Sequence, residues 1–397
     1  MNLNFKSRLI LIFILLFSIN LFGCSSAEPV LIDFHTEEQA EYLAGDYRLY
    51  KTYANGTEEL SRPNAAVISV GEKYNGSVVL VSEKEDLTDA RECIISDGEL
   101  KVYNLKTATT YYYGSADCAK PKGSFVTAAA APRNLYVEGV TNVRDLGGWC
   151  IEGSERAYAD AGTGDTTLQD SVDSSGTADS VVQSDTGSSG VTDSAAKNNT
   201  GSSGTVRQGM IFRCGKLSAD DTGETLITEE GIRVMREELK VRSEIDLRTV
   251  DDLENGGITV SPLGEDISYY SVPLESGGNI ILLNRDSLKD IFEIFGDESN
   301  YPIVFHCSIG TDRTGMVAFL INGLLGVSED DLYRDFLFSN FGEIGKMRAP
   351  SIIKTYIETV ETAQGDTLSE KIYNYLVDAG VEAEDLDELI RIMTFEQ

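Results

Sequence analysis

The sequence predicts an α/β domain with a mostly parallel central sheet flanked by helices, preceded by a small all-β sandwich domain. Two patterns carry this prediction. From residue 209 to residue 393, short apolar runs alternate with stretches of helical periodicity, as in strands joined by crossover helices. From residue 65 to residue 127, short β-branched runs are separated by turn residues, which favours antiparallel strands.

The all-β domain is expected over residues 29–131. Its strands are predicted at residues 65–70, 77–81, 100–103, 111–113 and 124–127. Residues 104–113 resemble the late-strand corner of a fibronectin type III domain. Because this half contains no catalytic grouping of residues, we expect it to serve as an adaptor or spacer.

The α/β domain is expected over residues 133–397, with an insertion at residues 153–205. The insertion is rich in Ser, Thr, Gly and Asp, buries too little apolar surface to offset its ordering entropy, and is predicted to be disordered. Its flanks, residues 149–151 and 209–214, are expected to form a hairpin whose base a Cys150–Cys214 disulfide would close; the alternative is that both cysteines are free buried thiols. Further strands are predicted at residues 241–247, 267–272 and 301–305, and helices at residues 228–239, 285–295, 314–325, 352–360, 368–377 and 384–393, with one more opening at Ser328.

The first 23 residues are predicted to be a signal peptide. A basic start with Lys6 and Arg8 precedes a short apolar run at residues 9–19, which is too short to span a bilayer stably. Residues 21–24, Leu-Phe-Gly-Cys, resemble the bacterial lipoprotein box, which implies that Cys24 is lipidated. The chain is then expected outside the cytoplasm, anchored to the bacterial cell membrane as a lipoprotein. The alternative is an ordinary signal peptide with an incidental cysteine.

Charge and composition exclude several partners. The net charge of −32 disfavours nucleic acid and anionic membrane surfaces, because polyanions would be repelled. With only His35 and His306 in the chain, a histidine-rich metal centre cannot be built, and neither metal nor cofactor is expected. Outside the cytoplasm Cys93 and Cys118 could form a disulfide or remain buried thiols. The sequence indicates no oligomeric state.

Residues 306–315, His-Cys-Ser-Ile-Gly-Thr-Asp-Arg-Thr-Gly, lie between a buried-type strand and an apolar helix. In such a loop, backbone N–H groups and the positive end of the helix dipole favour an anion, first a thiolate and then a phosphate. Cys307 is therefore the expected nucleophile, since the thiolate is the reactive form. The planar guanidinium of Arg313 suits two phosphate oxygens, and Gly310 permits the tight turn.

The other loop residues complete the predicted phosphate site. Ser308, Ile309, Gly310, Thr311 and Asp312 are expected to cradle the phosphate together with Arg313. The Thr314 hydroxyl is expected to hydrogen-bond the cysteine sulfur and help it leave when the phosphoenzyme hydrolyses. His306 is expected to orient the loop through backbone hydrogen bonds rather than to act as a base.

These residues resemble the signature of the protein tyrosine phosphatase superfamily, His-Cys-x5-Arg-Ser/Thr. Segments 142–148 (Asn-Val-Arg-Asp-Leu-Gly-Gly), 211–217, 245–248 and 331–340 resemble its bacterial tyrosine/lipid phosphatase branch. The resemblance covers about residues 133–395 and implies the cysteine-phosphatase fold, a cysteinyl-phosphate intermediate, and candidate site roles for Arg144, Asp145, Asp246 and Arg248. In that branch lysine usually stands where this chain has Thr311, and it is associated with phosphoinositide binding. Its replacement turns the expectation toward phosphoprotein substrates.

The general acid has three candidates. A leaving alkoxide or phenoxide needs a proton, and carboxylates are usual donors. By the resemblance Asp312 leads, Asp246 at a strand end is second, and Glu275 after Val-Pro-Leu is third. Each could instead form an ion pair with a nearby arginine, as Asp246 could with Arg248.

The leading functional hypothesis is a cysteine-dependent phosphatase acting on phosphotyrosine in proteins, with phosphoserine and phosphothreonine as further substrates. A phosphoinositide or inositol-polyphosphate phosphatase is the alternative enzyme. A surface protein that binds phosphorylated ligands without turnover is the alternative of another class. Reversible oxidation of Cys307, with Cys214 as the resolving thiol, is a further hypothesis.

Overall fold

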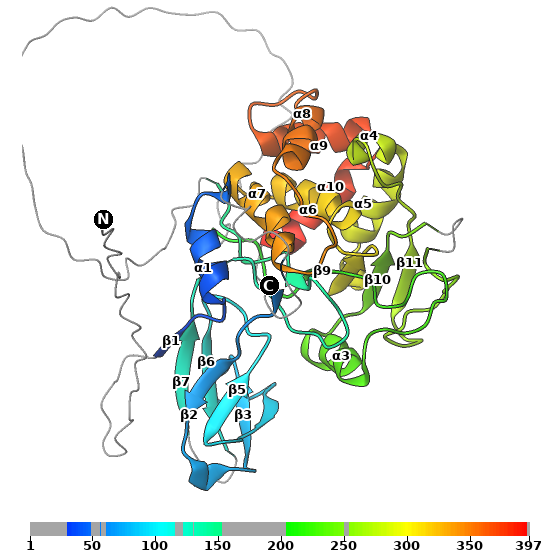
Figure 1. Ribbon diagram of the computed structural model, residues 1–397. Helices are drawn as coiled ribbons and strands as arrows, with labels where there is room; N and C mark the ends of the chain where they lie inside the picture. The colour runs from blue at the N-terminus through cyan, green and yellow to red at the C-terminus, as the bar shows by residue number, and fades with distance from the viewer. Residues whose placement is uncertain are drawn as a thin grey trace, which may run out of the picture.

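The computed structural model describes residues 30–48, 56, 61–115, 122–129, 131–152, 204–249 and 254–394 (Figure 1). The predicted signal peptide with Cys24, the cysteine at position 118 and residues 153–203 of the predicted insertion lie outside these ranges. Across the described ranges, no helix has both the length and the apolar character needed to cross a membrane.

Two sheets that share one core form a β-lobe at residues 66–127, joined by β1 (Figure 1). One sheet has the order β1-β7-β6-β3-β4, and β2 pairs with β5 in the other. Alternation along β3 sends Val79 and Val81 inward, where they share a core with Leu100 of β5 and Phe125 of β7. The arrangement is a small sandwich, and its likeness to a fibronectin type III domain stays a prediction. The strands are β1 (Val30–Ile32), β2 (Ala66–Ser69), β3 (Val78–Ser82), β4 (Arg91–Ile94), β5 (Glu99–Val102), β6 (Thr110–Gly114) and β7 (Gly123–Thr127).

Helix α1 (Glu37–Ala44) was not expected from the sequence. Its start is fixed by a capping box between Thr36 and Gln39. Tyr42 packs edge-on against Phe341, and Tyr47 beyond the helix stacks on Tyr333 with ring centroids 4.4 Å apart. The segment around α1 thus contributes to the hydrophobic core of the α/β domain rather than to the β-lobe.

The central sheet of the α/β domain has the order β11-β10-β12-β9-β8. Strands β9, β10, β11 and β12 are mutually parallel where they pair, and only the short β8 runs antiparallel to β9. The predicted mostly parallel sheet is confirmed. Its strands are β8 (Arg144–Asp145), β9 (Ile211–Cys214), β10 (Ser243–Asp246), β11 (Ser268–Ser271) and β12 (Ile303–His306).

Helices cover both faces of this sheet, because its inner strands bury side chains on both sides. Ile303 and Phe305 of β12 face the large core shared with α5 and α6, while Val304 faces a smaller core shared with Val234 after α3. Every residue of α6 is buried, as its apolar sequence predicted. The α-helices are α3 (Glu229–Arg233), α4 (Ile280–Leu283), α5 (Leu288–Gly296), α6 (Arg313–Leu324), α7 (Glu329–Phe338), α8 (Ser351–Val360), α9 (Leu368–Asp378) and α10 (Ala383–Thr394); η3 (Val234–Glu238) is a π-helix, and η2 (Glu72–Tyr74), η4 (Arg285–Ser287), η5 (Glu298–Asn300) and η6 (Ser339–Phe341) are 3-10 turns.

The hairpin that flanks the insertion is present, but the predicted Cys150–Cys214 disulfide is wrong. Cys150 lies opposite Thr205, whereas Arg144 lies opposite Arg213. This register places Cys214 at the far end of the hairpin from Cys150, and Cys214 is a buried free thiol. Cys93 is a free thiol on β4, and its expected partner at position 118 lies outside the described residues.

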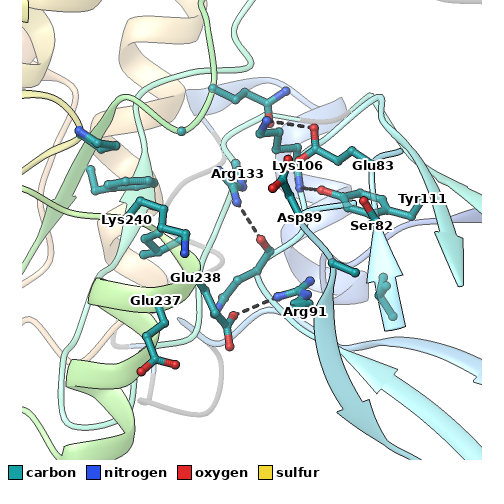
Figure 2. A pocket seen from close by; sticks show the side chains of 18 of the residues that line it. Ser82, Glu83, Asp89, Arg91, Lys106, Tyr111, Arg133, Glu237, Glu238 and Lys240 are labelled. Carbon is teal, nitrogen blue, oxygen red and sulfur yellow. Dashed lines mark hydrogen bonds and ion pairs between the residues drawn. The ribbon is translucent and has the colours of Figure 1, made fainter. Parts of the chain in front are cut away.

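Arg133 fastens the β-lobe to the α/β domain. Its guanidinium donates to the Leu105 and Asn104 carbonyls of the β-lobe and, at 2.8 Å, to Asp145 of β8. Arg91 of β4 adds an ion pair of 2.9 Å with Glu238 of η3. Between these contacts lies a cavity of about 710 Å³ lined mainly by charged side chains (Figure 2). Asp145, a candidate site residue, thus helps to join the β-lobe to the α/β domain through its ion pair with Arg133.

Candidate active site

The predicted phosphate loop begins where β12 ends. Cys307 follows His306, the last residue of the strand, and is 3% exposed. Arg313 is the first residue of the buried helix α6, so the loop turns directly from the strand into the helix. Because His306 is in register with Asp246 of β10, the carboxyl ends of both strands meet at this edge of the sheet.

Gly310 gives the loop its shape. Its φ is +74°, and a Cβ atom there would lie 2.2 Å from the Cys214 carbonyl oxygen, so no other residue fits. The Gly310 carbonyl accepts hydrogen bonds of 2.9 Å from Asn142 Nδ2 and from Arg213 Nη2. Thr311 is fully buried beside Asn142, whereas Ile309 is 37% exposed. The underside of the loop is therefore fixed by residues from β9 and the segment before β8.

Asp335 of α7 supports these groups. Its carboxylate accepts from Arg213 Nη1 at 2.5 Å and from Arg144 Nε at 3.2 Å. Both arginines are fully buried, so their charges depend on this partner. Arg144, a candidate site residue, thus acts on the loop through Asp335 and Asn142 without touching it.

The environment of Cys307 favours the thiolate. Burial raises the pKa of the thiol, but the positive charge of Arg313, the Thr314 hydroxyl and the backbone N–H groups of Thr314 and Ile309 outweigh it, and the net shift is downward. Thr314 Oγ1 makes no hydrogen bond of ordinary geometry, yet its hydroxyl lies near enough to the sulfur to favour the charge. This is the electrostatic setting that a cysteine nucleophile needs.

Glu254 holds Arg313, and sequence reasoning missed it. Its carboxylate accepts from Arg313 Nη1 at 2.8 Å and Nη2 at 2.5 Å, and from Ser308 Oγ at 2.6 Å. Burial raises the pKa of Glu254, but hydrogen bonds from Arg313, Ser308 and the Thr249 backbone hold it well below its usual range. In the sequence Glu254 ends an acidic run, Asp-Asp-Leu-Glu, and such a run is typical of a solvent-exposed surface.

The contacts of Arg313 leave one edge of its guanidinium open. Besides Glu254, its Nη1 donates to the Leu247 and Leu274 carbonyls at 3.4 and 3.2 Å. Among the described contacts, the Nε–H and the second N–H of Nη2 remain unused, and these two form a fork that fits two phosphate oxygens.

Asp312 is paired with Arg348, a second residue that sequence reasoning missed. Arg348 Nε and Nη2 each donate to the Asp312 carboxylate at 2.6 Å. Asn340 clamps Arg348 in turn, accepting from its backbone N–H at 2.8 Å and donating to its carbonyl at 3.0 Å. Both carboxyl oxygens of the leading general-acid candidate are therefore engaged by one guanidinium.

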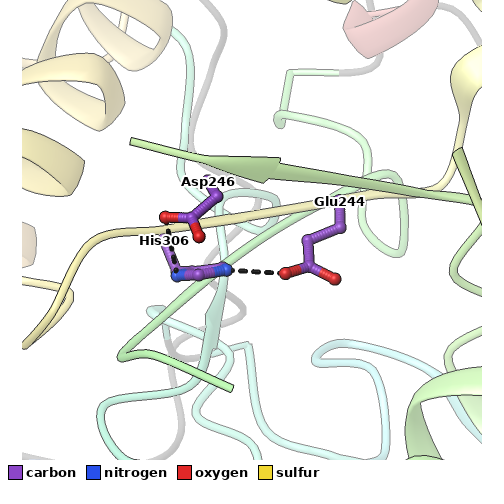
Figure 3. Close-up of side chains that lie close together, drawn as sticks. All are labelled: Glu244, Asp246 and His306. Atoms are coloured by element: carbon purple, nitrogen blue, oxygen red, sulfur yellow. Dashed lines mark hydrogen bonds and ion pairs between the residues drawn. The ribbon is translucent and has the colours of Figure 1, made fainter. Parts of the chain in front are cut away.

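Asp246 is also committed to a partner. It is fully buried and accepts from Arg248 Nε at 2.9 Å and Nη2 at 2.7 Å. Ligand atoms of Glu244, Asp246 and His306 lie within 4.8 Å of one another, a spacing that a metal ion could bridge (Figure 3). Protein donors already engage both carboxylates, which favours a hydrogen-bonded network over a metal centre.

Glu275, the third general-acid candidate, is exposed and directly follows Leu274, which contacts Arg313. The preceding carbonyl, of Leu274, accepts from Arg313. Buried Asn284 clamps the Glu275 backbone, donating to its carbonyl at 3.0 Å and accepting from its N–H at 2.7 Å. The Glu275 residue is exposed, and its side chain makes no hydrogen bond or ion pair with the described part of the chain.

A buried cysteine at the carboxyl end of a central parallel strand, followed by an arginine that opens a buried helix, defines the cysteine-phosphatase fold. A family model described as the tyrosine phosphatase family matches residues 194–394. This is just over half of the 397 residues, and the chain belongs to that family.

Individual relatives match less of the chain. A protein of Cupriavidus necator, provisionally named a tyrosine-protein phosphatase, is 47% identical over 38 residues, which is 10% of this chain and 14% of the relative's length. The solved core catalytic domain of the PP-IP phosphatase SIW14 from S. cerevisiae is 22% identical over 38% of this chain and 84% of its own, with a TM-score of 0.27. TpbA from P. aeruginosa is 15% identical over 42% of this chain and 88% of its own, with a TM-score of 0.28. The assignment of the fold therefore depends on the chain's own topology and on the family match.

Proposed function

We propose that the protein hydrolyses phosphate monoesters, above all phosphotyrosine in proteins, through a cysteinyl-phosphate intermediate on Cys307. The observation that carries the proposal is the buried Cys307 at the carboxyl end of β12, where the charge of Arg313 lowers the pKa of the thiol against the opposing effect of burial. Membership of the tyrosine phosphatase family supports it. TpbA, a solved protein of similar fold, has been crystallised in complex with pTyr.

The proposed reaction has two steps. The Cys307 thiolate attacks phosphorus, the S–P bond forms, and the bond from phosphorus to the leaving oxygen breaks while that oxygen takes a proton. The loop N–H groups and Arg313 stabilise the charge spread over the equatorial oxygens. Water then attacks the phosphoenzyme, inorganic phosphate leaves, and the thiolate returns with help from the Thr314 hydroxyl.

Glu275 is the proton donor that the geometry favours. Asp246 is buried against Arg248, and both oxygens of Asp312 already accept hydrogen bonds from Arg348. Within the described residues the Glu275 side chain has no such partner, and Asn284 fixes its backbone one residue from the carbonyl that contacts Arg313.

A leaving-group series tests this assignment. Glu275→Gln should lower kcat on a phosphotyrosyl peptide by about 100-fold, within the usual range for a general acid, and should change little on an aryl phosphate with an acidic leaving group. Asp312→Asn is the matched comparison. If Asp312→Asn rather than Glu275→Gln shows this dependence on the leaving group, the donor is Asp312.

Turnover of an aryl phosphate without added metal tests the function as a whole. Cys307→Ser should abolish it, and retained activity would exclude the covalent mechanism. A panel of phosphotyrosyl peptide, phosphoinositide and inositol polyphosphate separates the candidate substrates. Binding of phosphopeptide without turnover under reducing conditions would instead favour the surface binding protein.

We also propose that the chain is a lipoprotein anchored outside the cytoplasm through Cys24. The lipoprotein-like segment at residues 21–24 supports this proposal. Cys24→Ala should move the protein from the membrane fraction to the soluble fraction and prevent incorporation of labelled fatty acid. Unchanged fractionation and labelling would rule the anchor out.

A further inference from the structure

Oxygen acceptors surround the buried imidazole of His306 (Figure 3). Nε2 lies 2.9 Å from Glu244 Oε1. Nδ1 lies 3.4 Å from the Cys307 carbonyl oxygen and 3.8 Å from Asp246 Oδ1. A neutral imidazole has one N–H and one lone pair, and at either nitrogen the lone pair would face an oxygen acceptor. Only the doubly protonated ring satisfies both sides.

The charges around the ring lead to the same protonation state. Alternation along β10 places Glu244 and Asp246 on the same face of the strand, with Asp246 in register opposite His306. Asp246 is already neutralised by Arg248 at 2.7 Å. Within the described ranges, Glu244 has no cationic partner other than His306, and its second oxygen accepts from the Ser261 hydroxyl. A neutral His306 would leave a fully buried carboxylate uncompensated, which is costly.

We propose that Glu244 is a positioning residue that keeps His306 doubly protonated, so that His306 Nδ1–H donates to the Cys307 carbonyl and fixes the first peptide of the phosphate loop. The catalytic consequence rests on the proposed function, whereas the protonation state does not. A small displacement of a reacting group is costly in rate, so a second-layer contact of this kind matters to turnover.

Alkaline pH should release this contact. Burial alone lowers the pKa of His306, but Asp246 and Glu244 outweigh burial, and the net shift is upward. The contact is therefore complete below the ordinary histidine pKa and is lost as pH rises through the raised value. Arg248 opposes the shift.

Two further titratable groups near the ring, Tyr269 and Cys214, should stay uncharged at neutral pH. Tyr269 of β11 donates to Asp246 at 3.0 Å, and its pKa is raised, mainly by burial. Cys214 of β9 is the register partner of His306, and burial raises its pKa well above the ordinary value.

The presence of only two histidines makes a direct test possible. The full chain labelled with ¹⁵N-histidine should give two imidazole spin systems, and His35→Gln assigns them. At neutral pH the ring nitrogens of His306 should show the near-equal shifts of an imidazolium. In Glu244→Gln they should separate into those of a neutral ring. A neutral His306 in the wild-type chain would overturn the proposal, as would an imidazolium that persists in Glu244→Gln.

Kinetics give the second readout. Glu244→Gln should lower kcat by about 10- to 100-fold with a smaller effect on KM, and should move the alkaline limb of the kcat profile to lower pH. Glu244→Asp should restore part of the rate, and Glu230→Gln on the exposed face of α3 is the matched control. Unchanged kcat in a Glu244→Gln protein with a neutral His306 would refute the positioning role.

If Glu244→Gln does not fold, the wild-type spectrum alone decides the protonation state. A chain inactive on every phosphomonoester would refute the proposed function and leave that assignment standing.

Discussion

In the proposed reaction, the side chain of Glu254 determines which edge of the Arg313 guanidinium is available to the phosphate. By accepting one N–H from each terminal nitrogen, it leaves the Nε–Nη2 edge of the guanidinium unused among the described contacts. Without it the guanidinium would keep only backbone carbonyls as partners. Glu254→Gln should therefore lower kcat/KM on an aryl phosphate by about 10- to 100-fold, and Glu224→Gln, an exposed glutamate on another segment, should not. Equal rates in the two variants would contradict this role.

The nucleophile itself should be reactive at neutral pH. Because Arg313 and the loop donors outweigh burial, the pKa of Cys307 lies below that of an ordinary thiol, and the thiolate persists at lower pH. Alkylation of Cys307 by iodoacetamide, followed by peptide mass spectrometry across pH, should show its midpoint below that of Cys93, whose pKa burial raises. A midpoint for Cys307 at or above that of Cys93 would exclude an activated thiolate.

How far the sequence predicts this site depends on whether its parts are contiguous. Cys307 and Arg313 lie in one ten-residue motif between a strand and a helix, so local pattern predicts them. Glu254 and Arg348 join the loop from segments 59 and 36 positions away from Arg313 and Asp312. As single charged residues in polar surroundings they have the same pattern as solvated surface. No periodicity distinguishes them.

At the scale of elements, α7 supports the phosphate loop through one carboxylate. Asp335 compensates both Arg144 and Arg213, and Arg213 in turn holds the Gly310 carbonyl. Asp335→Asn would leave two buried guanidinium groups without an anion. We expect a loss of about 3–5 kcal/mol in the free energy of unfolding, measured by urea denaturation. Asp331→Asn at the amino end of the same helix removes a more peripheral pair with Arg334 and should cost less. Equal losses of stability in the two variants would contradict the larger contribution expected of Asp335.

The pairing of β9 with β12 also bears on the hypothesis that Cys214 is the resolving thiol for oxidised Cys307. Cys214 is adjacent to the start of the loop, since it is the register partner of His306. Burial raises its pKa well above the ordinary value, so at neutral pH it is a thiol and a poor attacking group. Peroxide should therefore convert Cys307 to a sulfenic acid that dimedone traps in mass spectra. Rapid, complete formation of a Cys214–Cys307 disulfide would contradict this expectation.

Elements with strong periodicity were predictable, and those set by tertiary contact were not. The apolar run of α6 and the buried strand β12 give clear signals, and the structure has both. Helix α1 is short and its only large apolar residues are Tyr42 and Leu43, and a packing partner, Phe341, lies about 300 positions along the chain. The Cys150–Cys214 disulfide failed for a related reason, because composition indicates a hairpin but not its register.

For the whole molecule, the insertion has a simple geometric property. The chain leaves the α/β domain at Ile151 and returns at Gly204, and the two residues are joined by a backbone hydrogen bond of 3.0 Å. Replacing residues 153–203 with a four-residue Gly-Ser turn should raise the free energy of unfolding by no more than about 2 kcal/mol, because each halving of a flexible loop recovers only about 0.6 kcal/mol of loop-closure entropy. Urea denaturation and turnover of an aryl phosphate would check this. A large loss of stability or rate would show that the segment contributes contacts.

Because the exit and entry points lie close together, this position is also suited to the insertion of another folded domain. A folded reporter whose own termini lie side by side could replace residues 153–203 without stretching the host. The same position could supply new chain ends for a circular permutant, with the original termini joined by a linker. The hairpin includes β8 and β9, and Arg213 of β9 donates to the Gly310 carbonyl of the proposed phosphate loop. A reporter inserted there would therefore be linked to this loop through short strands.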